Sequence, residues 1–153
     1  MIRYTHTNLV ARDWRRLADF YIEVLGCVPV PPERDLSGEW LDKATSLQGA
    51  HIRGVHLRLP GHGDAGPTLE VFQYDEDTEA ETPAPNRPGY GHIAFSVEDV
   101  EAVKEAVLAL GGGTVGEVVK VDLPGVGTLE FAYTRDPEGN VIEIQRLAST
   151  PSA

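Results

Sequence analysis

The sequence predicts an α+β domain built from two repeated modules, and three observations lead to this prediction. The chain has 153 residues, of which 41% are apolar, enough for one buried core without disulfide support. Segments with the period of a strand alternate with segments with the period of a helix. The third observation is a repeat, because His6 precedes Asp13 by seven residues and His92 precedes Asp99 by seven residues. Each half is therefore predicted to contain a strand, a helix and two or three further strands.

The first module is predicted to open with a strand over residues 2–10 and a helix over residues 13–25. Asp13 is a typical N-cap residue, and Gly26 stands where helices commonly end. Between them, apolar residues recur three and four positions apart, which is typical of a helix that packs one face on a sheet. These residues are Trp14, Leu17, Phe20, Tyr21, Val24 and Leu25.

The rest of the first module is predicted to be a loop followed by a hairpin. Three prolines follow the helix, and residues 33–48 favour a loop with at most one helical turn, which resembles a lid. Residues 52–59 and 68–74 have the pattern of strands, and the segment between them is rich in glycine and proline. Residues 76–88 are acidic and proline-rich, a composition that favours a linker.

The second module repeats this order. Its first strand is expected in residues 91–99 and its helix from Asp99 to Leu110, before three glycines in succession. Further strands are expected at residues 114–121, 128–133 and 140–146, and we expect residues 148–153 to be a disordered tail. Residues 1–147 are thus predicted to form a single domain of two modules, about 1–75 and 89–147, joined by the linker 76–88.

Charge and cysteine content narrow the class of protein. Lys and Arg total 13 against 24 Asp and Glu, so the net charge of −11 disfavours nucleic acids and anionic membranes as partners. Cys27 is the only cysteine, which excludes an internal disulfide and a cysteine-based zinc cluster and fits a reducing compartment. No apolar run approaches the length of a membrane span or a signal peptide. We therefore expect a soluble, cytoplasmic protein whose partner is a small molecule.

Alternation along the strands brings polar residues to corresponding places in the two halves. Glu70 lies between Leu69 and Val71, and Glu143 lies between Ile142 and Ile144, so each carboxylate should face away from the helix side of its sheet. His92 has the same relation to Ile93 and Phe95, and the repeat assigns His6 to the equivalent position. A buried carboxylate in such a place is costly unless a cation compensates it. His51 and His62 lie in or near loops and are expected to be solvated.

Four segments, HTNLVARD…FYIEVLG, GPTLEVFQY, GHIAFSVEDV and DPEGNVIEI, resemble the vicinal oxygen chelate superfamily. This superfamily includes glyoxalase I, methylmalonyl-CoA epimerase, extradiol dioxygenases and the fosfomycin and bleomycin resistance proteins. The resemblance extends from His6 to Gln145 and implies two βαβββ modules that form a cupped mixed sheet with the helices on the outside. It also implies a homodimer. One divalent metal would be bound at the positions held here by His6, Glu70, His92 and Glu143.

Such a donor set suits one divalent transition metal, Zn, Ni, Co, Mn or Fe, and disfavours Ca. Four protein ligands leave two positions of an octahedron for two adjacent substrate oxygens. That arrangement fits polarisation of a carbonyl and stabilisation of an enediolate after a proton leaves the neighbouring carbon. Glu143 is the first candidate for the base, with Glu70 as its partner. The fourth ligand argues against a ring-cleaving dioxygenase, which typically uses three.

Further candidates lie near these ligands. His56 and Arg58 alternate with aliphatic residues, so His56 is a candidate acid or base and Arg58 a candidate anchor for a substrate carboxylate or phosphate. A polar sheet face without a role is the alternative interpretation of both. Trp40 either closes over a ligand or anchors its loop.

Two functions remain open. The first is a metal-dependent lyase or isomerase, either glyoxalase I-like or epimerase-like. The second is a binding protein of the antibiotic-resistance type that sequesters a small molecule, with stacking by Trp40, Tyr4, Phe72 and Tyr90. Cys27 is expected to be a packed residue without a chemical role.

Overall fold

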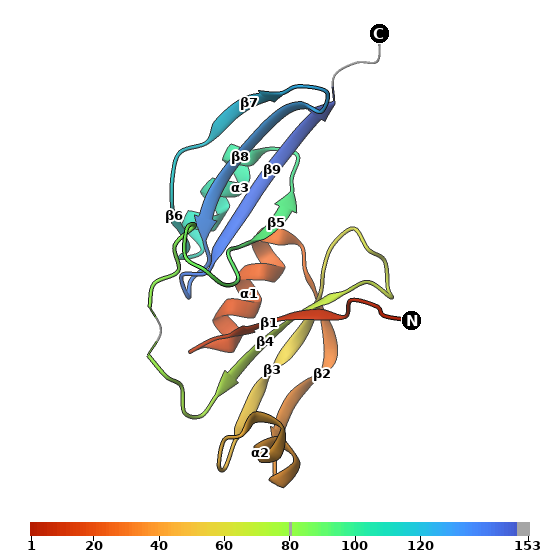
Figure 1. Cartoon of the computed structure of the whole chain (residues 1–153), viewed down its shortest axis with the longest axis vertical. Coiled ribbons are helices and arrows are strands. Elements are labelled where there is room, and N and C mark those ends of the chain that lie inside the picture. The colour runs from red at the N-terminus through yellow and green to blue at the C-terminus, as the bar shows by residue number, and fades with distance from the viewer. Residues whose placement is uncertain (80, 150–153) are drawn as a thin grey trace. The chain divides into compact units, whose positions relative to one another are not determined.

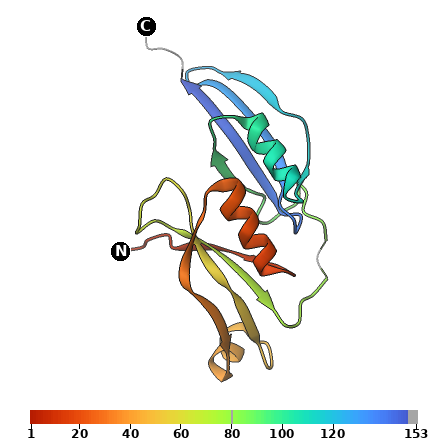
Figure 2. The same cartoon turned by 180° about the vertical axis from the view of Figure 1, so that it is seen from behind.

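The chain divides into two compact units, Met1–Ala80 and Glu81–Ala153. A computed structural model describes residues 1–79 and 81–149 of it (Figure 1). Each unit consists of one sheet with a helix packed on it, and Figure 2 shows these two helices, α1 and α3, each lying along the strands of its own unit. Within the described residues, no helix has the length and apolar character needed to cross a bilayer.

The first unit contains six elements in a four-stranded sheet with two helices. They are β1 (His6–Val10), α1 (Trp14–Leu25), β2 (Val28–Ser37), α2 (Glu39–Thr45), β3 (His51–Arg58) and β4 (Thr68–Tyr74). The strand order is β1-β4-β3-β2. The first strand, β1, runs parallel to the last, β4, whereas the other neighbours are antiparallel. This parallel pairing joins the beginning of the unit to its end.

The second unit repeats this topology. Its elements are β5 (Ile93–Ser96), α3 (Val100–Ala109), β6 (Gly113–Thr114), β7 (Val119–Leu123), β8 (Gly127–Arg135) and β9 (Val141–Ser149). The strand order is β5-β9-β8-β6, with β7 also paired to β8. Again the first strand, β5, is parallel to the last, β9. The predicted α+β class and the repeated module are confirmed.

Both long helices begin at the residues that the sequence indicated. The Asp13 carboxylate accepts a hydrogen bond from the backbone N–H of Arg16 at 3.1 Å, and Asp99 does the same for Ala102 at 3.0 Å. Gly26 has a φ of 68°, the left-handed conformation in which a helix commonly ends. Capping therefore fixes the start of each helix immediately after the first strand of its unit.

The predicted loop after α1 is wrong, because residues 28–37 form strand β2. Its prolines are tolerated since β2 lies at the edge of the sheet and pairs only with β3. A β-bulge between Val30 and Arg34 absorbs the irregular stretch. The expected single helical turn is a seven-residue helix, α2, whose Leu41 is buried against the sheet.

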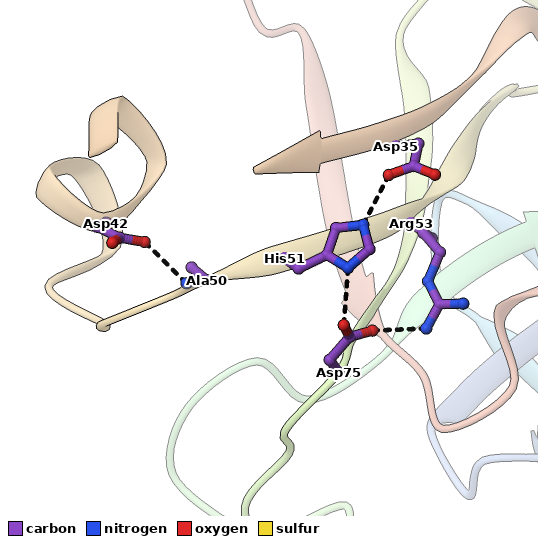
Figure 3. A network of polar contacts seen from close by, with 6 residues as sticks. All are labelled: Asp35, Asp42, Ala50, His51, Arg53 and Asp75. Atoms are coloured by element: carbon purple, nitrogen blue, oxygen red, sulfur yellow. Dashed lines mark hydrogen bonds and ion pairs between the residues drawn. The ribbon is translucent and has the colours of Figure 1, made fainter. Parts of the chain in front are cut away.

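Three smaller expectations need correction. The strand predicted at residues 114–121 is divided between β6 and β7. Residues 148 and 149 belong to β9 through pairing with β8, and the rest of the expected tail, residues 150–153, lies outside the described residues. His51 is not simply solvated, because it begins β3 and its two ring nitrogens contact Asp35 and Asp75 (Figure 3).

Candidate functional site

One histidine and one glutamate meet in each unit, and the repeated parallel pairing explains why. In the first unit Asn8 of β1 is paired with Glu70 of β4, and His6 lies two residues before Asn8 on the same face. Nε2 of His6 is 3.3 Å from Oε2 of Glu70. The sequence therefore folds so that residues 64 positions apart come within hydrogen-bonding distance.

The second unit has the same arrangement. Ala94 of β5 is paired with Glu143 of β9, and His92 lies two residues before Ala94. Nε2 of His92 is 2.9 Å from Oε2 of Glu143. The Glu70 and Glu143 side chains are 14% and 13% exposed, so both carboxylates are largely withdrawn from water. Each of these carboxylates requires polar or cationic partners.

His56 supplies a second partner to Glu70. It lies opposite Glu70 in the β3–β4 pairing, with its Nε2 3.0 Å from Oε1 of Glu70 and its Nδ1 3.1 Å from the Thr68 hydroxyl. Burial lowers the pKa of His56. The negative charge of Glu70 acts in the opposite direction, and the positive charge of Arg34 lowers the pKa further. The neutral imidazole is thereby favoured, and it can donate one hydrogen bond and accept another.

Tyr133 occupies the equivalent position in the second unit and is a site residue that the sequence pattern had not indicated. It lies opposite Glu143 in the β8–β9 pairing, and its ring centroid is 5.1 Å from that of His92. Burial raises the pKa of Tyr133, and the neighbouring charge of Glu143 and a hydrogen bond to it raise it further. Alternation in residues 128–133 could have placed Tyr133 on this face, but the register that sets it opposite Glu143 is not visible in the sequence.

The two His–Glu pairs have the chemistry and spacing of metal ligands. Adjacent ligands of an octahedral ion with bonds of about 2.1 Å lie about 3 Å apart. The observed separations of 3.3 and 2.9 Å match that value. In residues 1–79 and 81–149, no group of three or more His, Cys, Asp or Glu side chains gathers as a metal site. Each unit thus presents two donors that fit adjacent positions on a divalent metal.

The other predicted site residues have different surroundings. Arg58 is partly buried and forms an ion pair with Asp64 at 3.2 Å. Phe72 is buried with Leu41, Ala50 and Ile52 beneath α2, and its ring edge approaches His56 with 5.7 Å between centroids. Trp40 on α2 is exposed, as are Tyr4 and Tyr90.

Comparisons with known proteins agree on one family. The family model described as a glyoxalase-like domain matches residues 6–145. A Vibrio parahaemolyticus protein named probable lactoylglutathione lyase is 28% identical over 93% of this chain and 88% of its own length. A lactoylglutathione lyase of Arabidopsis thaliana is 28% identical over 97% of this chain, which spans only 46% of that protein. The crystal structure of a glyoxalase family protein from Bacillus cereus has a TM-score of 0.81 at 22% identity, covering 97% of this chain and 96% of that one.

Proposed function

Because the chain belongs to the glyoxalase-like domain family, we propose that it is a metal-dependent lyase or isomerase that removes a proton next to a carbonyl. The observation that carries this proposal is the repeated His–Glu pair at ligand spacing in both units. Glyoxalase I-like chemistry on a hemithioacetal and epimerisation of a 2-substituted malonyl thioester both fit. The lactoylglutathione lyase names of two relatives support the first.

We propose that the ligands of one divalent metal, Zn, Ni, Co, Mn or Fe, are His6, Glu70, His92 and Glu143. The neutral imidazoles and the two carboxylates suit these ions and balance a charge of +2. When bound, the metal would polarise the substrate carbonyl and lower the cost of the enediolate charge.

The protein groups divide the proton transfers between them. Glu143 takes the proton from the carbon beside the carbonyl, while the Tyr133 hydrogen bond orients its carboxylate. Glu70, the partner carboxylate, takes up a proton from solvent and delivers it to the substrate, and Glu143 releases its proton to solvent. His56 holds Glu70 through the contact at 3.0 Å and serves as a second acid or base. The Glu70 and Glu143 side chains retain 14% and 13% exposure, so a proton taken from the substrate can exchange with solvent before one is returned.

Proton exchange tests the reaction. Metal-loaded protein is incubated in D2O with methylglyoxal plus thiol, and separately with methylmalonyl-CoA, and deuterium at the α-carbon is followed by NMR. We expect incorporation with one substrate and its loss in Glu143→Gln, whereas Glu98→Gln, an exposed carboxylate outside the pairs, should behave as the wild type. Absence of exchange with both substrates would contradict the enzyme.

Metal content tests the ligand set separately. Elemental analysis of protein purified without chelator should find one metal per chain and much less in a His6→Ala, Glu143→Ala double variant. Equal metal content in the two proteins would overturn the assignment of these residues, whatever the reaction.

A binding protein that sequesters a small molecule is the second candidate, and one feature favours it. On the face of the second sheet that carries Glu143, five apolar residues gather around Gln145 and are partly or largely exposed: Val119, Val121, Leu129, Phe131 and Leu147. Such a surface suits an apolar ligand. Tight binding of an aromatic compound that quenches tryptophan fluorescence, without any proton exchange, would favour this function over the enzyme.

We also propose a homodimer, since modules of this superfamily pair within a chain or between chains. Light scattering at micromolar concentration tests this, with twice the chain mass expected and the chain mass alone contradicting it.

A further inference from the structure

Besides Arg58, a second arginine, Arg34, lies on the sheet face that carries Glu70 and His56. Arg34 of β2 is paired with Gly54 of β3, and directly paired residues of antiparallel strands point to the same face. Gly54 is two residues from His56, so Arg34 is the diagonal neighbour of His56 on this face. The interaction of its charge with His56 agrees with this placement.

The β-bulge in β2 creates this placement. Val30 is paired with His56 and Arg34 with Gly54, so β2 advances four residues where β3 advances two. If β2 continued in regular register without the bulge, Pro32 would lie opposite Gly54 and the guanidinium would be absent from this position. The irregular proline-rich segment therefore brings a cation beside the candidate catalytic residues.

Arg34 also differs from its neighbours in how its charge is balanced. Arg58 on this face pairs with Asp64, and Arg53 on the opposite face pairs with Asp75. Arg34 donates to the carbonyl oxygen of Pro32 in its own strand, and no carboxylate among the described residues forms an ion pair with it. Arg34 is partly buried, and its guanidinium, which has no carboxylate partner among the described residues, has N–H donors that suit an anion.

We propose that Arg34 binds an oxyanion of the substrate, a carboxylate or a phosphate a few bonds from the reacting carbonyl. One strand separates β2 from β4, and Arg34 lies across from Phe72, two residues beyond Glu70, so the backbones of Arg34 and Glu70 are about 12 Å apart, a span that the two side chains and a small acid or acyl thioester can bridge. This inference rests on the proposed function for the reaction, but the binding of the anion does not depend on it. Arg34, rather than the already paired Arg58, then selects anionic substrates.

Direct titration of the arginine side chains tests the proposal. The Nε–Hε resonances of the purified metal-loaded protein are followed by NMR during titration with propionate and, separately, with inorganic phosphate. We expect one of the two anions to shift one such resonance to saturation, which identifies the oxyanion. The affinity should fall about tenfold or more in Arg34→Gln, since hydrogen bonds to a charged group are lost.

Matched variants decide which arginine is responsible. Arg15→Gln removes an exposed guanidinium that is paired with Glu33 in the same unit, and it should leave the affinity unchanged. Unchanged affinity in Arg34→Gln, or a loss confined to Arg58→Gln, would overturn the proposal. Failure of both anions to bind the wild type would do so as well.

Kinetics link the anion to the substrate. If the protein exchanges methylmalonyl-CoA, Arg34→Gln should raise KM about tenfold or more and change kcat little; if it exchanges the uncharged adduct of methylglyoxal and 2-mercaptoethanol, Arg34→Gln should leave that exchange unaffected. An unchanged KM in the first case, or a raised KM in the second, would contradict selection of an anion. If the wild type exchanges neither substrate, the proposed function fails, and the NMR titration still decides whether Arg34 binds an oxyanion.

Discussion

Glu70 and Glu143 hold equivalent positions but have different neighbours. Glu70 contacts His6 and His56 and accepts a hydrogen bond from the Asn8 amide at 3.3 Å. Among the residues that the structure describes, Glu143 contacts only His92 and Tyr133, from which it accepts a hydrogen bond. A carboxylate with fewer partners can change its orientation at lower cost. This difference favours Glu143 as the residue that moves a proton.

Replacement of Tyr133 by Phe tests this assignment at the level of one hydroxyl. We expect the rate of deuterium exchange to fall about tenfold, because a hydrogen bond to a charged group is lost, with unchanged metal content. Tyr74→Phe is the matched control, since Tyr74 packs at the edge of the cluster beneath α2. Loss of metal along with activity would show that Tyr133 supports the ligand set instead of the base.

Cys27 is 2% exposed, and burial raises the pKa of its thiol to about 12. Because the thiolate is the reactive form, we expect a disulfide reagent to modify Cys27 very slowly in the native protein and rapidly in denaturant. Absorbance of the released thiol chromophore gives both rates. Fast stoichiometric modification of the native protein would be incompatible with this packed thiol.

At the level of elements, His51 joins three strands of the first unit. Its Nε2 is 2.6 Å from Asp35 of β2, and its Nδ1 is 2.7 Å from Asp75, which follows β4 (Figure 3). Arg53, which lies on β3 like His51, forms an ion pair with the same Asp75. Asp42 of α2 accepts hydrogen bonds from the N–H groups of Gly49 and Ala50 and so fixes the entry to β3.

This contact predicts a pH dependence of stability. The hydrogen bonds to Asp35 and Asp75 raise the pKa of His51 above 6.5, so the protonated form stabilises the folded state. That contribution is complete below about pH 6.5 and is lost as pH rises through the higher folded value. His51 and Arg53 lower the pKa of Asp75. The ionised Asp75 therefore stabilises the folded state above pH 3.8, its ordinary pKa, and this stabilisation is lost as the pH falls through the lower pKa of the folded protein.

The experiment compares melting temperatures of the wild type and His51→Gln between about pH 5 and pH 9. At the acidic end we expect the wild type to have a higher melting temperature than His51→Gln. This difference between the two proteins should shrink toward the alkaline end. His62→Gln, in the exposed turn between β3 and β4, should show no such trend. A difference that is constant with pH would contradict the role of His51.

Local signals in the sequence predicted the helices well and the edge strand poorly. Asp13 and Gly26 mark a helix through short-range hydrogen bonds, which are set by neighbouring residues. Pro31 and Pro32 normally end a strand, and only the position of β2 at the sheet edge makes them acceptable. Likewise, alternation indicated the face of His56, whereas Tyr133 and Arg34 depend on register and on a bulge, which form only in the tertiary structure.

At the level of the whole molecule, metal removal should lower stability. A ligand present at about 1,000 times its dissociation constant stabilises the folded state by about 4 kcal/mol. For a chain of this size, that corresponds to a melting temperature lower by roughly 10 °C after treatment with a chelator. Calorimetry of the wild type and of His6→Ala measures this. A chelator effect that is equally large in His6→Ala would indicate binding elsewhere.

The parallel pairing of the first and last strands in each unit has a consequence for folding. His6 and Glu70 are joined only when β4 docks beside β1, and His92 and Glu143 only when β9 docks beside β5. Contacts between residues so distant along the chain close late, because the entropy of the intervening loop must first be overcome. A ribosome that has not yet released β4 therefore carries a first unit without its His–Glu pair. Assembly of each pair is thus postponed until the unit that holds it has its last strand in place.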